Sequence, residues 1–172
     1  MKNIVLTGFM GTGKTAVGRE LSKLLGLKLV EIDSEIERRT GKSIKEIFRD
    51  DGEAKFRDLE TEVIKEFSDR ENLIISTGGG AVMREENIRA LKKKGILFCL
   101  TAEPESILQR TSRSDERPLL NVDDPLKRIK ELLEARRPQY MRADRMINTE
   151  GKTPSQVARE IIATLRKEFG NN

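Results

Sequence analysis

Residues 8–15 read Gly8-Phe9-Met10-Gly11-Thr12-Gly13-Lys14-Thr15 and match the pattern G-x-x-x-x-G-K-[ST] at every fixed position. Glycines here let backbone N–H groups curl around phosphate oxygens, and the helix that follows points its positive end at the same anion. Lys14 is expected to reach the β and γ phosphates, and the Thr15 hydroxyl to ligate magnesium. An apolar run precedes the motif and an amphipathic stretch follows it, which disfavours the alternative of a glycine-rich turn with an exposed lysine. The motif therefore predicts a site for a nucleoside triphosphate with Mg²⁺.

Short apolar runs alternate with amphipathic stretches along the rest of the 172 residues. The apolar runs predict five strands, at residues 3–6, 28–32, 73–76, 96–100 and 145–148. Apolar side chains at helical spacing predict the helices between them, with stripes that begin at Val17, Phe56, Ile88, Leu126 and Val157. Five strands separated by helices imply one α/β domain over residues 1–172, with a parallel sheet covered on both faces and ligands at the carboxyl ends of the strands.

Local end signals support several of these helices. Gly26 is the expected C-cap of the first, since its apolar stripe, Val17 to Leu25, stops there. Ser43 with Glu46 predicts a capping box, and Thr153 followed by Pro154 predicts the start of the last helix. The stretch from 113 to 125 has no apolar periodicity, and we expect a mobile lid over about 112–124.

Composition excludes several classes of function. The chain has no histidine, which removes serine triads with histidine, histidine-ligated zinc and imidazole bases, so any general base must be a carboxylate or a lysine. Cys99 is the only cysteine, so there is no internal disulfide. Aromatic residues make up 4% and the net charge is +4, which disfavours a nucleic-acid surface. No apolar run is long enough for a membrane span, and we expect a cytoplasmic protein.

Two acidic residues, Glu31 and Asp33, follow the second predicted strand. This position would place carboxylates beside the phosphate loop, where an acceptor hydroxyl could meet the γ-phosphate. The alternative is that Asp33 or Ser34 only caps a helix over 35–39. The chain has no Asn-Lys-x-Asp element and no aspartate at the end of the third strand, which argues against a guanine-nucleotide switch and a motor ATPase.

Arginines and glycines outside the phosphate loop have ordinary explanations when each is taken alone. Residues 77–81, Thr-Gly-Gly-Gly-Ala, could form a flexible turn, and Arg57 with Glu60 could be a solvated ion pair. Arg136, at the end of a predicted helix, could simply favour the helix dipole. Together, however, such arginines supply the forked donors that a kinase with an anionic acceptor requires.

The order and spacing of these motifs resemble those of shikimate kinases across nearly the whole chain. The matching segments are the phosphate loop, 31–33, 36–41, 47–48, 52–53, 56–57, 78–81, 117–120 and 136–140. The resemblance implies a P-loop NTPase of the nucleoside-monophosphate-kinase-like type, a three-layer α/β/α fold with a five-stranded parallel sheet in the order 2-3-1-4-5. It implies transfer of the ATP γ-phosphoryl group to the 3-hydroxyl of shikimate, in the route to chorismate and aromatic amino acids, by a monomer with a shikimate-binding region at about 33–61.

The resemblance also assigns roles to individual residues. Asp33 would be the base, with Lys14 and Arg117 offsetting phosphate charge. The residues implied for ATP are Gly11, Thr12, Gly13, Lys14, Thr15, Ala16, Arg110, Arg117 and Lys152. Those implied for shikimate are Asp33, Phe48, Phe56, Arg57, Glu60, Gly78, Gly79, Gly80 and Arg136.

Magnesium would be held by Thr15 directly and by Glu31 and Asp33 through water. The family commonly shows Asp-x-Asp where this chain has Glu31-Ile32-Asp33, so the longer Glu31 side chain would need a small shift. Two rival functions remain: another small-molecule kinase on this scaffold, acting on gluconate or a nucleoside monophosphate, and a non-catalytic ATP-binding module.

Overall fold

The structure, a computed structural model, describes residues 1–112, 120 and 122–170. Arg117 and most of the expected lid at 112–124 lie outside the described residues. In the part of the chain that is described, no helix is long and apolar enough to cross a membrane.

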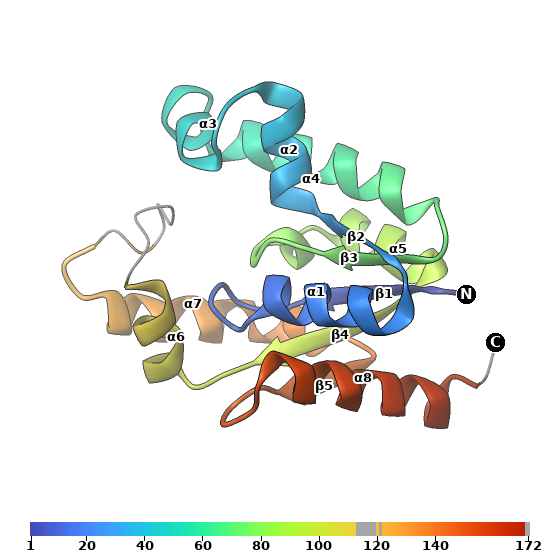
Figure 1. Ribbon diagram of the computed structural model, residues 1–172. Coiled ribbons are helices and arrows are strands. Elements are labelled where there is room, and N and C mark those ends of the chain that lie inside the picture. The colour runs from blue at the N-terminus through green and yellow to red at the C-terminus, as the bar shows by residue number, and fades with distance from the viewer. Residues whose placement is uncertain (113–119, 121, 171–172) are drawn as a thin grey trace.

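A five-stranded parallel sheet forms the centre of the molecule (Figure 1). The strands stand in the order β2-β3-β1-β4-β5, which confirms the order that the resemblance implied. Their bounds are β1 Asn3–Thr7, β2 Lys28–Glu31, β3 Leu73–Ser76, β4 Gly95–Thr101 and β5 Arg145–Asn148. All five predicted strands are therefore present, with ends that differ by two residues or fewer.

Alternate residues of the central strands face opposite sides of the sheet, as strand geometry requires. Ile4 and Ile74 pack in one apolar cluster with α1 (Lys14–Leu25) and α8 (Pro154–Glu168). Val5 and Ile75 pack in the other, which includes α4 (Glu53–Ser68) and α5 (Glu85–Lys94). Both faces of the sheet are thus covered, which confirms the three-layer architecture.

A third apolar cluster lies toward the carboxyl ends of the strands. It joins Phe9 of the phosphate loop and Cys99 of β4 to α6 (Pro104–Thr111) and α7 (Pro125–Tyr140). The Cys99 thiol is buried there, and burial raises its pKa to about 11, in keeping with a packing role rather than a reactive one.

Two short helices, α2 (Ile32–Thr40) and α3 (Ile44–Asp50), stand above the β2 edge of the sheet in Figure 1. The α3 helix begins with the predicted capping box of Ser43 and Glu46. A 3₁₀ turn, η1 (Ala81–Met83), follows the glycine loop after β3. The predicted caps at Gly26 and Thr153 are also confirmed, Gly26 with a φ of 67°.

Three details of the predicted elements were wrong. The second strand ends at Glu31, and α2 begins at Ile32 with Glu31 as its N-cap, so neither Asp33 nor Ser34 is a cap. Leu24 is 41% exposed, because the face of α1 that contacts the sheet is narrower than the apolar stripe. Helix α6 was not predicted, since its eight residues are too few to show a clear apolar period.

Candidate active site

The phosphate loop connects β1 to α1, as the motif predicts. At Gly8 a Cβ would lie 2.3 Å from the Leu100 carbonyl oxygen, and the φ of 126° also favours glycine. The Lys14 Nζ donates hydrogen bonds to the carbonyl oxygens of Gly8 and Phe9, both at 2.8 Å. Arg110, on α6, donates from Nη1 to the Gly11 carbonyl at 3.1 Å. The loop is thus bordered by two cations from different elements.

Glu31 reaches the phosphate loop directly. The Thr15 hydroxyl donates a 2.6 Å hydrogen bond to its Oε1, and Arg19 Nη2 lies 3.9 Å from its Oε2. The extra methylene of glutamate therefore does not keep the carboxylate away from Thr15. A hydroxyl and a carboxylate oxygen in contact are the hard ligands that Mg²⁺ prefers beside substrate phosphates, so these residues fit a magnesium site.

The glycine loop, Gly78–Gly80, brings two carboxylates and two guanidinium groups together. A Cβ at Gly78 would lie 3.0 Å from Glu60 Oε2 and 3.1 Å from Asp33 Oδ1. At Gly80 it would lie 2.4 Å from Arg57 Nη2. A side chain at Gly80 would therefore displace the Arg57 guanidinium, and one at Gly78 would press on both carboxylates.

Arg57 and Glu60 form an ion pair on α4, in which Glu60 is buried and Arg57 is partly exposed. Arg57 Nη1 donates to Glu60 Oε1 at 2.9 Å, and the side chains are 14% and 0% exposed. Burial raises the pKa of Glu60 to about 7 against the opposing charge of Arg57, and nearby Asp33 adds to the rise. Arg57 also lies over the Phe56 ring, 5.1 Å from its centroid. The pair is therefore not the solvated surface pair that was the ordinary alternative.

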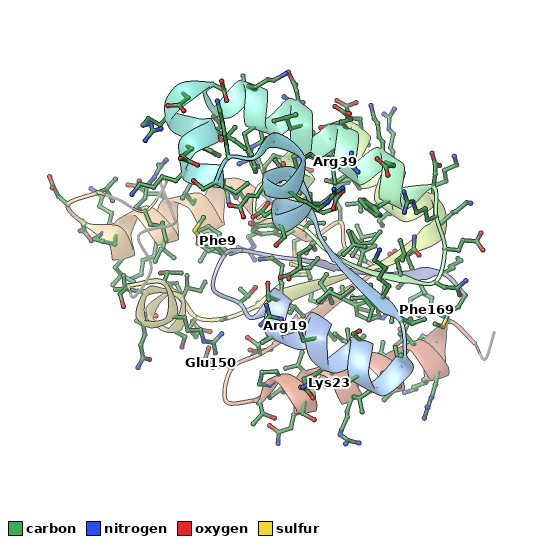
Figure 2. The ribbon with its side chains drawn as sticks, turned by 45° about the horizontal axis from the view of Figure 1, so that its top comes forward. Phe9, Arg19, Lys23, Arg39, Glu150 and Phe169 are labelled. Atoms are coloured by element: carbon green, nitrogen blue, oxygen red, sulfur yellow. The ribbon has the colours of Figure 1, made fainter. Side chains whose placement is uncertain are left out.

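Arg136 is a buried cation from the last turn of α7. It is 6% exposed, and its guanidinium lies 5.5 Å from the centroid of the Phe9 ring, which Figure 2 labels in the phosphate loop. Among the residues that the structure describes, its Nη1 has no hydrogen-bond partner. A desolvated donor of this kind is suited to an anionic ligand.

These groups line one cavity of about 690 Å³. The predicted site residues that line it are Gly11, Gly13, Lys14, Thr15, Ala16, Glu31, Asp33, Phe48, Phe56, Arg57, Glu60, Gly78, Gly79, Gly80, Arg110 and Arg136. The structure thus brings together segments more than one hundred residues apart, and the phosphate loop and the arginines line the same open cavity.

Two predicted residues lie elsewhere. Thr12 is buried, and its hydroxyl donates to the Phe9 carbonyl at 2.8 Å, so its side chain stabilises the loop. Lys152 is exposed and pairs with Glu160 at 2.7 Å. The adjacent Thr153 and Pro154 line a second cavity of about 370 Å³, which shares Ala16 and Arg19 with the first.

Sequence reasoning missed several residues of the main cavity: Met10, Arg19, Ser34, Glu37, Ser43, Ile44, Lys45, Ser76 and Thr77. Figure 2 shows Arg19 projecting from α1. The Glu37 carboxylate accepts a 2.9 Å hydrogen bond from the Ile44 backbone N–H, which ties α2 to the start of α3. Glu37 lies four residues after Asp33, and this helical spacing could have indicated a shared face.

Comparisons with known proteins agree with the geometry. The family model described as shikimate kinase matches residues 10–166. A shikimate kinase of Thermodesulfovibrio yellowstonii is 52% identical over 162 residues, which cover 94% of each chain, and one of Persephonella marina is 47% identical over 166 residues, covering 96% of this chain and 100% of the relative. Among solved structures, shikimate kinase from Acinetobacter baumannii in complex with shikimate superimposes with a TM-score of 0.93 at 42% identity, covering 96% of this chain and 93% of that chain.

Proposed function

The chain belongs to the shikimate kinase family, and we propose that it transfers the γ-phosphoryl group of ATP to the 3-hydroxyl of shikimate, giving shikimate 3-phosphate and ADP. This reaction is a step in the synthesis of chorismate and the aromatic amino acids. One observation carries the proposal: the phosphate loop and two guanidinium groups, of the partly exposed Arg57 and the buried Arg136, line the same cavity.

The acceptor is proposed to bind at the glycine-loop end of the cavity. Arg57 and Arg136 grip its carboxylate, because desolvated guanidinium groups make strong forked hydrogen bonds to carboxylates. Asp33 and the backbone N–H groups of Gly78–Gly80 hold the ring hydroxyls. Phe48 and Phe56, whose ring centroids are 5.0 Å apart, form the apolar wall. Glu60 holds Arg57 in place through the 2.9 Å bond.

The donor ATP is proposed to bind at the other end, with its phosphates on residues 11–16 and its adenine between Arg110 and the turn that begins at Lys152. The exposed position of Lys152 leaves Thr153 and Pro154 as the residues of that turn that line a cavity. Thr15 would hold magnesium directly and Glu31 and Asp33 would hold it through water; the ion would supply positive charge to offset that of the phosphates.

Catalysis then requires positioning and charge neutralisation more than covalent chemistry. Asp33 orients the acceptor hydroxyl and takes its proton late in the transfer. Lys14, which lies across the loop on the carbonyls of Gly8 and Phe9, offsets charge on the transferred phosphoryl group.

A coupled assay of ADP release tests the function. We expect rapid release with ATP, Mg²⁺ and shikimate, and little with gluconate, a nucleoside monophosphate or no acceptor. The variants Lys14→Ala and Asp33→Asn should fold and lose turnover, and near-normal activity of Asp33→Asn would remove it as the base. Equal ADP release with and without shikimate would refute the function itself.

We further propose that residues 1–172 form one kinase domain, which acts as a monomer in the cytoplasm. In the described part of the chain, the continuous five-stranded sheet and the single main cavity at the carboxyl ends of its strands support this. Sedimentation of the purified protein would test the oligomeric state.

A further inference from the structure

Tyr140 makes a buried contact with the glycine loop that the proposed mechanism does not use. It is the last residue of α7, and its hydroxyl donates a 2.6 Å hydrogen bond to the Gly79 carbonyl, 61 residues away in the sequence. The residue is 6% exposed. Burial raises the pKa of its phenol to about 12 against the lowering effect of Arg136, so the hydroxyl remains a donor at any working pH.

The backbone that follows Tyr140 is held by hydrogen bonds to β4 and not to the glycine loop. In the turn that follows α7, the Asp144 N–H donates to the Leu97 carbonyl, and the Asp144 carboxylate accepts from the Leu97 N–H, both at 2.8 Å. The tyrosine ring itself packs in the apolar cluster that contains Phe9 and Cys99. Tyr140 is therefore the fixed partner of the hydrogen bond, and the glycine loop is the part that the bond holds.

The glycine loop lies between the two guanidinium groups proposed to grip the acceptor. A Cβ would lie 2.4 Å from Arg57 Nη2 if placed at Gly80, and 3.4 Å from Arg136 Nη1 if placed at Gly79. The trans peptide that joins Gly79 to Gly80 is planar, so fixing the Gly79 carbonyl also fixes the Gly80 N–H, on the side away from Tyr140. A rotation of this peptide would change the surface against which both arginines rest.

We propose that Tyr140 is a positioning residue for the phosphoryl acceptor: its hydroxyl holds the glycine loop in the orientation that spaces Arg57 and Arg136 for a carboxylate. Arg136 and Tyr140 are four residues apart, on one face of α7. One helical turn thus supplies the guanidinium group of Arg136 and, through Tyr140, also fixes the glycine loop against which that group rests. This inference rests on the proposed function, because it assigns the carboxylate of the acceptor to these two arginines.

The variant Tyr140→Phe tests the proposal, because it removes the hydroxyl and keeps the ring. We expect the KM for shikimate to rise about tenfold, while the KM for ATP stays within about twofold. Ser22→Ala is the matched control: the Ser22 hydroxyl also donates a 2.6 Å bond to a carbonyl, that of Leu27, but Ser22 lines neither cavity. An unchanged KM for shikimate, or an equal rise in both KM values, would overturn the proposal.

A spectroscopic test applies even if Tyr140→Phe does not fold. Tyr140 is the only tyrosine of the chain, so growth on fluorotyrosine places one fluorine label beside the glycine loop and keeps the donor hydroxyl. We expect the labelled enzyme to keep the wild-type KM, and its single ¹⁹F resonance to shift on saturation with shikimate but not with gluconate. If the ¹⁹F resonance did not shift with shikimate although the enzyme phosphorylated it, the role of Tyr140 would be overturned and the proposed function would stand. Wild-type enzyme without shikimate-dependent ADP release would instead refute the proposed function.

Discussion

Glu31 accepts a 2.6 Å hydrogen bond from the Thr15 hydroxyl and so stands beside the proposed magnesium position. The variant Glu31→Gln keeps the length of the side chain and an acceptor oxygen but removes its charge. We expect the Mg²⁺ concentration for half-maximal rate to rise about tenfold, because partners that orient metal ligands contribute about 10- to 100-fold to affinity. Initial rates measured against Mg²⁺ at fixed ATP check this. Glu62→Gln, at an exposed position on α4, is the control, and an unchanged Mg²⁺ requirement would exclude Glu31 from the site.

Glu60 is fully buried, with a pKa raised to about 7 by burial and by Asp33, against the opposing charges of Arg57 and Arg84. The pKa lies above the unfolded value of 4.5, so the stability that its neutral form contributes is complete below about pH 4.5 and is lost as the pH rises through about 7. A bound carboxylate on Arg57 would add negative charge and favour the neutral form further.

We therefore expect the KM for shikimate to fall as the pH is lowered from about 8 to about 6. Glu60→Gln imitates the neutral form and should flatten this dependence, and it should be more stable than the wild type above pH 7. Kinetics and chemical denaturation across the pH range measure both effects. A pH dependence that persists unchanged in Glu60→Gln would assign it to another group.

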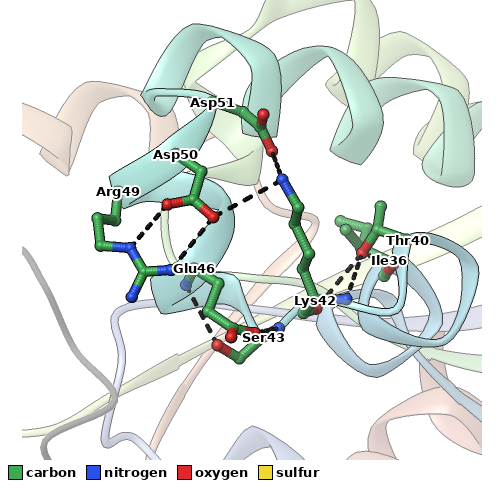
Figure 3. Close-up of polar contacts among 8 residues, drawn as sticks. All are labelled: Ile36, Thr40, Lys42, Ser43, Glu46, Arg49, Asp50 and Asp51. Carbon is green, nitrogen blue, oxygen red and sulfur yellow. Dashed lines mark hydrogen bonds and ion pairs between the residues drawn. The ribbon is translucent and has the colours of Figure 1, made fainter.

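Helix α3 is short, but polar contacts at both ends fasten it as a wall of the cavity (Figure 3). Lys42, before the helix, places its Nζ 3.8 Å from Asp50, the last residue of the helix, and 2.8 Å from Asp51, its C-cap. The helix carries Ile44 and Phe48, which line the cavity. Lys42 thus joins the residue before α3 to the carboxylates at its other end, and we expect these ion pairs to hold Ile44 and Phe48 in the cavity wall.

Lys42→Ala should loosen this wall. Because exposed ion pairs are weak, we expect only about a two- to fivefold rise in the KM for shikimate, with the KM for ATP unchanged. Arg49→Ala is the matched control, since Arg49 pairs at 2.7 Å with the adjacent Asp50 on the same helix. Lys42→Arg should restore the wild-type KM. Equal effects of Lys42→Ala and Arg49→Ala would contradict the bridging role.

Elements with a strong local signal could be predicted from the sequence. The five strands are short apolar runs between polar segments, the capping box at Ser43 depends on residues three apart, and the N-cap Thr153 is followed directly by Pro154. Helix α6 packs Ile107 and the partly buried Leu108 into the third apolar cluster. Two adjacent apolar residues do not show the spacing of a helix in the sequence. The start of α2 was misplaced because a buried isoleucine fits the end of a strand as well as the first turn of a helix, and Ile32 is fully buried.

For the molecule as a whole, features that depend on neighbouring residues in the sequence could be predicted, and features that depend on distant residues brought together by the fold could not. The phosphate loop could be predicted outright, because its mechanism is contained in eight consecutive residues. Arg57 and Arg136 could be proposed from the sequence as donors to an anionic acceptor, but their joint place beside the glycine loop follows only from the fold. Tyr140 and Glu37 were assigned no role. Each bonds to a backbone atom, Tyr140 to the Gly79 carbonyl and Glu37 to the Ile44 N–H, and the identity of a residue does not show which backbone atom its side chain contacts.

The cavity is lined by α1, α2, α3, α4, α7 and the loop after β3, so a ligand in it contacts elements from across the fold. A ligand that binds only the folded state at 100 times its Kd adds about 2.7 kcal/mol to the free energy of unfolding. For a chain of this size, each kcal/mol shifts the Tm by about 2–4 °C, so shikimate at that concentration should raise the Tm by about 5–11 °C.

Calorimetry with a panel of ligands therefore tests the acceptor without any turnover. Gluconate, which presents a carboxylate on an open chain, should give little shift, because the cavity wall of Phe48 and Phe56 suits a ring. Arg136→Ala removes charge-assisted hydrogen bonds worth about 1.5–3 kcal/mol and should lose most of the shift at the same shikimate concentration. If Arg136→Ala kept the full shift, the carboxylate would have to lie elsewhere in the cavity. Because this measurement reports binding alone, a normal shift in an inactive Asp33→Asn variant would then separate the role of the base from that of the guanidinium groups.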